Sequence, residues 1–174
     1  PHKETRIDFK SNGHGNGIIS YSKKTNHNIT ATSSSNWSSN ISPNDLLDWN
    51  TNSRWVAGKK GEGEWVSFQF DFSVSVTQIA VITDYQRWPK RWELQGSNDG
   101  TNFELIQSFG ENQELNSNKN EVLIDVICSK YFTHIRILAK GEMYSHNLSK
   151  FRLPNFQVYA VEFFGVVRTT EAIN

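Results

Sequence analysis

The segment from Tyr85 to Arg91 carries the residue types best suited to holding a ligand. It reads Tyr-Gln-Arg-Trp-Pro-Lys-Arg, so that Trp88 follows Arg87 directly and Lys90 comes soon after. An exposed aromatic ring can stack on the apolar face of a sugar or peptide, and a guanidinium group donates paired hydrogen bonds to oxygen atoms. We therefore expect a binding site in this segment. The alternative is that Trp88 packs inward and anchors its loop.

Single-stranded nucleic acid is another ligand to consider for this segment, because two tryptophans and three basic residues could contact it. The chain has 18 basic and 18 acidic residues, so its formal net charge is zero and no overall field attracts nucleic acid or an anionic membrane. No row of aromatic residues across neighbouring strands offers a platform for bases. We therefore expect neither nucleic acid nor membrane lipid as a partner, and we leave the oligomeric state open.

Sequence motifs of enzymes are absent from the chain. Neither G-x-S-x-G nor H-E-x-x-H occurs, and the histidines lack metal-ligand spacing. The basic, glycine-rich stretch from Gly58 to Gly63 departs from the P-loop pattern and leads into a strand rather than a helix. No pair of carboxylates is singled out for glycoside hydrolysis. The sequence thus predicts a binding protein rather than an enzyme.

The elements that must position these residues are short strands. Trp92 to Gly96 and Phe103 to Ile106 alternate in polarity on either side of Ser97–Gly100, whose residue types tolerate positive φ and allow a hairpin turn. Pro43 to Trp49 is expected to form one helical turn capped by Asn44 or Asp45. The other expected strands are the stretch from Ile29, Trp65–Phe72, Ile79–Ile82, Glu121–Cys128, Tyr131–Leu138 and Phe156–Phe164.

Roughly eight short strands without a long amphipathic helix are typical of an all-β protein, an antiparallel β-sandwich or jelly roll. A chain of 174 residues can form one domain with its own core, and six Trp, eleven Phe and five Tyr supply large buried areas. We expect an N-terminal extension over residues 1–28, the main domain over residues 29–165 and a C-terminal tail over residues 166–174.

Six stretches of the chain, taken in order, resemble one known family. They are Ile29–Ser35, Asn44–Trp55, Glu64–Phe72, Trp92–Gly100, Tyr131–Ile137 and Val158–Gly165. They resemble the discoidin family, the F5/8 type C domain of coagulation factors within the galactose-binding-like superfamily. The resemblance implies a non-catalytic jelly roll whose loops at one end bind a sugar, a phospholipid head group or a protein.

The resemblance also implies which residues contact the ligand. Related lectins use basic residues from loops that correspond to the segment around Arg87, so we expect Arg87 and Trp88 to bind the ligand. We expect Trp49, Arg54 and Lys90 to join them, together with the loop over residues 140–147. The partner is then a glycan or another protein.

A calcium ion is a second implication of the resemblance. Many discoidin-like lectins hold one at an Asp-x-Asn loop followed by Ser or Thr and Trp, together with a Glu from the last strand. The matching positions are Asp45, Asp48, Asn50, Ser53 and Glu162. Hard oxygen ligands of this kind suit Ca²⁺. Trp49 stands where the family usually has Gly. The same side chains could instead form caps and turns, with Glu162 paired to a basic residue.

The number of cysteines bears on the cellular compartment in which the protein is expected. Cys128 is the only cysteine, so the pair that usually ties together the ends of extracellular family members is absent. The sequence of residues 89–100 resembles intracellular members found beside BTB or ubiquitin-ligase modules, and Gly17–Tyr21 resembles a strand that precedes the domain in proteins of that kind. We therefore expect a cytoplasmic protein-interaction domain of a larger adaptor. The alternative is a calcium-dependent lectin of a surface or secreted protein, which would be compatible with Asn-x-Ser/Thr sequons at Asn28, Asn36, Asn40 and Asn147.

Overall fold

The computed structural model describes residues 2–11, 16–83, 87–116, 120–141, 143 and 155–172. Antiparallel strands make up most of this part of the chain, and the predicted all-β sandwich is confirmed. Within the described residues, no helix combines the length and the apolar character that crossing a bilayer requires.

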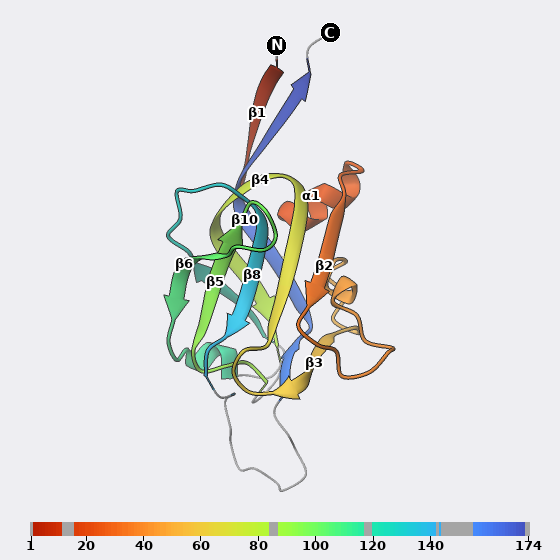
Figure 1. Cartoon of the computed structure of the whole chain (residues 1–174), viewed down its shortest axis with the longest axis vertical. Coiled ribbons are helices and arrows are strands. Elements are labelled where there is room, and N and C mark those ends of the chain that lie inside the picture. Colours follow the sequence, from red (N-terminus) through yellow and green to blue (C-terminus); the bar gives the residue numbers. More distant parts are fainter. Residues whose placement is uncertain are drawn as a thin grey trace, which may run out of the picture.

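One long strand, β4 (Trp65–Ile82), joins the two layers of the sandwich (Figure 1). Its antiparallel partners are β2 (Ile29–Ser33) and β8 (Phe132–Ala139) along its N-terminal half, and β7 (Glu121–Asp125) and β10 (Ala160–Ala172) along its C-terminal half. The sequence predicted two strands in this region. Val74 and Val76 are buried and continue the alternation between the two predicted strands, so that a single strand runs through both layers.

The remaining strands extend these layers. β5 (Trp92–Ser97) pairs with β8 and with the edge strand β6 (Glu104–Phe109), which confirms the predicted hairpin. A separate two-stranded sheet contains β3 (Trp55–Lys60) and β9 (Asn155–Val158). Two short 3-10 helices, η1 (Pro43–Leu46) and η2 (Gln113–Asn116), lie in the connecting loops.

Aromatic side chains fill the space between the layers. Phe68 and Phe163 meet edge to face at 5.3 Å, and Trp55 and Phe156 do so at the same distance. All four side chains are fully buried. Burying an apolar side chain of this size contributes about 1.5–3 kcal/mol, so the aromatic content expected to supply the core does so.

The N-terminal residues differ from the prediction. Residues 18–24 form the helix α1 (Ile18–Lys24) rather than a strand, and its buried residues Ile18, Ile19 and Ser22 follow helical spacing. Before it, β1 (His2–Phe9) pairs with the last part of β10. The start of the expected extension and the expected tail therefore form one two-stranded ribbon, which projects from the body of the domain (Figure 1).

Candidate functional site

Four backbone segments lie side by side at the end of the sandwich away from this ribbon (Figure 1). They are residues 34–37, β3, β9 and residues 87–91, and we call them the platform. The N–H group of Trp37 donates to the carbonyl of Val56 in β3 at 2.9 Å, and β3 pairs with β9. The N–H group of Gln157 in β9 donates to the carbonyl of Arg87, also at 2.9 Å. Long-range pairing thus assembles the platform from distant parts of the chain.

Trp37 is 58% exposed although its loop is firmly held. Trp55 Nε1 donates to the Ser35 carbonyl at 3.2 Å and to Asn36 Oδ1 at 3.0 Å, and the N–H group of Gly58 donates to Ser35 Oγ at 2.8 Å. A Cβ atom on Gly58 would lie 2.5 Å from the Asn36 carbonyl oxygen, so the close approach of β3 requires glycine. Sequence reasoning missed Trp37. The available signal was its position in a run of Ser and Asn, which offers the ring no apolar neighbours.

Trp49 follows a capped turn. Ser42 Oγ accepts from the N–H group of Asn44 at 3.2 Å, and the Asp45 carboxylate accepts from the N–H group of Ser42 at 3.2 Å. The cap is therefore Ser42, whereas the sequence predicted Asn44 or Asp45. Trp49 has a φ of +52°, in the left-handed region that favours glycine.

The ring of Trp49 is half-buried against Tyr159, Ile82 and Ala160. Arg54 is exposed, and its Nη1 atom lies 3.5 Å from the hydroxyl of Tyr159. The structure therefore brings Trp49 and Arg54 together around one tyrosine. Sequence reasoning treated Tyr159 only as part of a strand, since its distance of 105 positions from Arg54 concealed the contact.

Residues 87–91 are fixed by their backbone. The carbonyl of Arg87 accepts from β9, and the carbonyl of Arg91 accepts from the N–H group of Lys140 at 2.9 Å. Pro89 forms an isolated bridge with Met143. Arg87 and Lys90 are half-buried in this segment, and their role in ligand binding stays a prediction. Tyr85, Gln86 and most of the expected ligand loop over residues 140–147 lie outside the described residues.

Trp88 does not have the predicted exposure. Its ring is fully buried and meets Trp92 at 5.2 Å and Phe156 at 5.1 Å, edge to face in both cases. A ring enclosed in this way has no face on which a ligand can stack. The prediction that Trp88 contacts the ligand is therefore wrong, and the alternative that it anchors its loop is correct.

Four of the five expected calcium ligands, all but the exposed Asp48, are engaged within the chain. Besides the cap made by Asp45, Asn50 Oδ1 accepts from the N–H group of Asn52 at 2.9 Å, and Ser53 Oγ lies 3.2 Å from the Asp45 carbonyl and 3.1 Å from the Asn50 carbonyl. These are the caps and turn bonds that were the alternative. Among the described residues, no group of three or more His, Cys, Asp or Glu side chains is arranged to hold a metal ion.

Glu162 is 2% exposed and bonded to backbone N–H groups. Its Oε1 atom accepts from Ile19 at 2.7 Å and from Phe163 at 2.8 Å, and its Oε2 atom accepts from Ser20 at 3.1 Å. Burial raises the pKa of Glu162 to about 7, although these N–H groups and that of Gly17 act to lower it. The start of α1 therefore stands where the alternative had a basic partner, and Glu162, with both oxygens occupied by N–H groups, does not fit a cation site.

A pocket of about 220 Å³ lies between α1, the loop that carries Trp49, and β10. Lys23 and Lys24 line it from α1, while Asp48 and Trp49 line it from the loop and Glu162 from β10. Three residues expected to bind a metal or ligand thus share one pocket, with two cations beside them. The arrangement suits contact with a polar ligand better than coordination of a metal.

Comparison with known proteins identifies the family of the chain. The family model for the F5/8 type C domain matches residues 28–151, well over half of the chain. The chain belongs to this family, the discoidin domains. No curated protein sequence matches the chain.

Solved structures with a similar fold include three sugar-bound modules. CpGH89CBM32-5 from Clostridium perfringens, in complex with GalNAc-beta-1,3-galactose, is 15% identical with a TM-score of 0.60 and covers 82% of this chain and 97% of its own. The family 32 module of C. perfringens NanJ, in complex with galactose, is 14% identical with a TM-score of 0.58, covering 81% and 93%. Chitosan-binding module 2 of a Paenibacillus sp. IK-5 chitosanase/glucanase, in complex with chitotriose, is 15% identical with a TM-score of 0.57, covering 79% and 97%. At these identities the likeness shows the fold.

Proposed function

We propose that this chain is a non-catalytic carbohydrate-binding module that holds its ligand at the platform. The observation that carries the proposal is Trp37, a largely exposed aromatic side chain on a loop fixed by hydrogen bonds to β3. Because the backbone is already ordered, binding at this ring requires little further loss of conformational entropy. Preorganised aromatic residues of this kind are what sugar rings stack against.

Arg54 supplies the polar part of the proposed site. It directly precedes β3, whose residue Val56 accepts the hydrogen bond from Trp37, so both residues adjoin β3. Its exposed guanidinium group can donate to the hydroxyl oxygens of a sugar, and the hydroxyl of Tyr159 lies beside it. Membership of the discoidin family and the sugars bound by three structural neighbours support this assignment.

Binding to a glycan array and calorimetry with galactose and chito-oligosaccharides test the proposal. We expect Trp37→Ala and Arg54→Ala to lose at least about tenfold in affinity, which corresponds to about 1.4 kcal/mol. Arg6→Ala on the ribbon and Ile127→Ala near β7 are matched controls, since both residues are exposed and remote from the platform. Equal binding by all four variants, or no glycan bound by the wild-type chain, contradicts the proposal.

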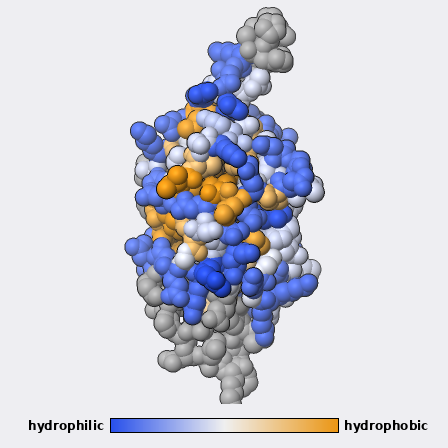
Figure 2. Space-filling model, turned by 60° about the vertical axis from the view of Figure 1, so that its left-hand side comes forward, coloured by the Kyte–Doolittle hydropathy of each residue, from blue (hydrophilic) through white to orange (hydrophobic). Residues whose placement is uncertain are grey.

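A protein-interaction role is the second candidate, and exposed apolar side chains favour it. Leu105 in β6 is 54% exposed, Leu123 in β7 is 45% exposed, and Ile127 beyond β7 is 84% exposed. Figure 2 brings the β6 side of the molecule forward and shows hydrophobic surface bordered by hydrophilic residues. Surface of this kind can serve an interface. The cytoplasmic location and the adaptor role expected from the sequence stay predictions.

The two candidates use different faces, so paired variants separate them. An adaptor predicts that Leu105→Ser together with Ile127→Ser abolishes binding of a protein partner, while Trp37→Ala has no effect. A glycan-binding module predicts the reverse dependence. Secretion or cytoplasmic retention of the full-length gene product then decides the compartment.

A further inference from the structure

Gly17 allows α1 to approach β10 unusually closely. A Cβ atom at this position would lie 2.3 Å from the carbonyl oxygen of Phe163 and 2.6 Å from Cγ of Glu162. Distances this short are not tolerated between real atoms, so only glycine fits here without displacing the chain. The approach is what brings the N–H groups of Ile19 and Ser20 onto the carboxylate of Glu162.

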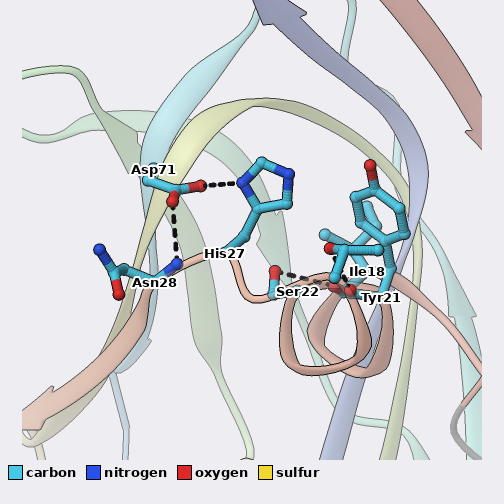
Figure 3. A network of polar contacts seen from close by, with 7 residues as sticks. Ile18, Tyr21, Ser22, His27, Asn28 and Asp71 are labelled. Atoms are coloured by element: carbon cyan, nitrogen blue, oxygen red, sulfur yellow. Dashed lines mark hydrogen bonds and ion pairs between the residues drawn. The ribbon is translucent and has the colours of Figure 1, made fainter.

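The other end of α1 is also fixed to the sheet (Figure 3). The carboxylate of Asp71 in β4 bonds to the ring of His27 and accepts from the N–H group of Asn28, both at 2.8 Å. Within the helix, Ser22 Oγ donates to the carbonyl of Ile18 at 3.1 Å. The ring of Tyr21 packs 5.9 Å from that of Phe72. Contacts at both ends make α1 an integral part of the domain.

The charges around Glu162 oppose a divalent cation. Both carboxylate oxygens already accept N–H groups, and the same pocket is lined by the cations of Lys23 and Lys24. A calcium ion would have to displace these donors from the carboxylate and lie close to two ammonium groups. The N–H groups instead supply the positive end of local dipoles, which stabilises the buried carboxylate.

We infer that α1 replaces the structural cation that the family resemblance implies, and that Glu162 clamps this helix to β10 without calcium. The clamp serves the purpose that calcium would have served, because it ties an N-terminal segment to the last strand. The inference is independent of the proposed glycan binding. A module without sugar affinity would still fold around the same clamp.

Calcium titration of the full chain is the first test. Thermal unfolding is compared in excess calcium and in chelator, and the amide signals of Ile19, Ser20 and Phe163 are followed by two-dimensional NMR. We expect the same Tm in both conditions and unchanged amide shifts. A Tm that rises with calcium, or calcium-dependent shifts at these three amides, overturns the inference.

Hydrogen exchange tests the clamp itself. Gly17→Ala should accelerate exchange at the amides of Ile19 and Ser20 about tenfold or more, as expected when their hydrogen bonds to the carboxyl group of Glu162 are lost. Gly110→Ala is the matched control, since a Cβ atom there meets no atom of the described residues within 4 Å. Unchanged exchange at Ile19 and Ser20 in Gly17→Ala would falsify the clamp.

Glu162→Gln gives a second route if Gly17→Ala does not fold. The amide keeps the size of the side chain but removes its charge and one acceptor oxygen. We expect faster exchange at Ile19 and Ser20 and a Tm that remains insensitive to calcium. Exchange equal to that of the wild type means that α1 is held by other contacts, and the inference fails.

Discussion

Trp37 and Trp88 lie on two segments of the same platform and have opposite environments. Trp88 has basic neighbours and was the obvious candidate for ligand contact, yet it is fully buried between Trp92 and Phe156. Trp37 lies in a polar run and is 58% exposed. Polar neighbours in the sequence therefore do not by themselves predict whether a tryptophan is exposed, and what its backbone segment is bonded to must be known as well.

The two rings differ in exposure because their loops are attached to the rest of the domain in different ways. Residues 34–37 use their hydrogen bonds to attach to β3, and the ring of Trp37 is left on the outside. Residues 87–91 are held by hydrogen bonds to β9 and to Lys140, and the ring of Trp88 packs inward against Trp92 and Phe156. One loop presents its aromatic side chain, and the other uses it as an anchor.

The largest expected effect comes from truncating the buried ring. Trp88→Ala should lower the free energy of unfolding by about 3–5 kcal/mol, because it leaves a cavity beside two aromatic rings. Trp88→Phe should cost less, since Trp88 Nε1 has no hydrogen-bond partner within the described part of the chain and nothing is left unpaired. Urea unfolding measures both. If Trp88→Ala unfolds like the wild type, the contrast with Trp37 is lost.

Local patterns explain why the strands could be predicted. Alternation and turn chemistry are properties of neighbouring residues, so the β5–β6 hairpin and the strand nature of β8 and β10 follow from the sequence. The adjacent pair Ile18 and Ile19 fits a strand as well as a short helix. The burial of Ser22 identifies the helix only once the structure is known.

The site could be predicted less well, because its parts meet through long-range pairing. Tyr159 reaches Arg54 only when β9 pairs with β3, and Trp37 reaches the platform only through Val56. Trp49 was identified as a departure from the glycine usual in the family. Its φ of +52° gives the physical reason for that glycine, which sequence alone does not reveal.

Glu162, another buried group, should make stability depend on pH. Its usual pKa of 4.5 is raised by burial to about 7 in the folded chain. At a pH below 4.5, Glu162 is protonated in both the folded and the unfolded chain, and its contribution to stability is complete. Between pH 4.5 and about 7, only the folded chain keeps the proton. Stability should therefore fall by about 3 kcal/mol as the pH rises through this range, and then level off.

Unfolding by urea at several pH values checks this dependence, with Glu162→Gln as the reference. Subtracting the variant removes the contributions of the histidines and of the other carboxylates. The wild type should lose stability relative to the variant across this window. Parallel curves for the two proteins would mean that the carboxylate titrates normally in the folded state.

Trp49 is intermediate between the exposed and the buried tryptophan, and two substitutions separate its backbone from its ring. Both Trp49→Ala and Trp49→Gly remove the packing against Tyr159, but only glycine adopts a φ of +52° without strain. Trp49→Gly should be more stable than Trp49→Ala by about 1 kcal/mol. Thermal unfolding of the pair measures the difference. Equal stability would show that the loop relaxes to another conformation once the ring is gone.

Trp37→Ala should have the smallest effect on stability, within about 0.5 kcal/mol of the wild type, because an exposed side chain loses few contacts. The hydrogen bonds of its loop come from its own N–H group and from Ser35 and Asn36, so truncating the ring leaves them in place. Urea unfolding beside Trp88→Ala provides the comparison. A loss as large as that for Trp88→Ala would assign the ring of Trp37 to the core. A small loss joined to a loss of glycan affinity would mean that the fold fixes the loop independently of the ring, which is then available to a ligand.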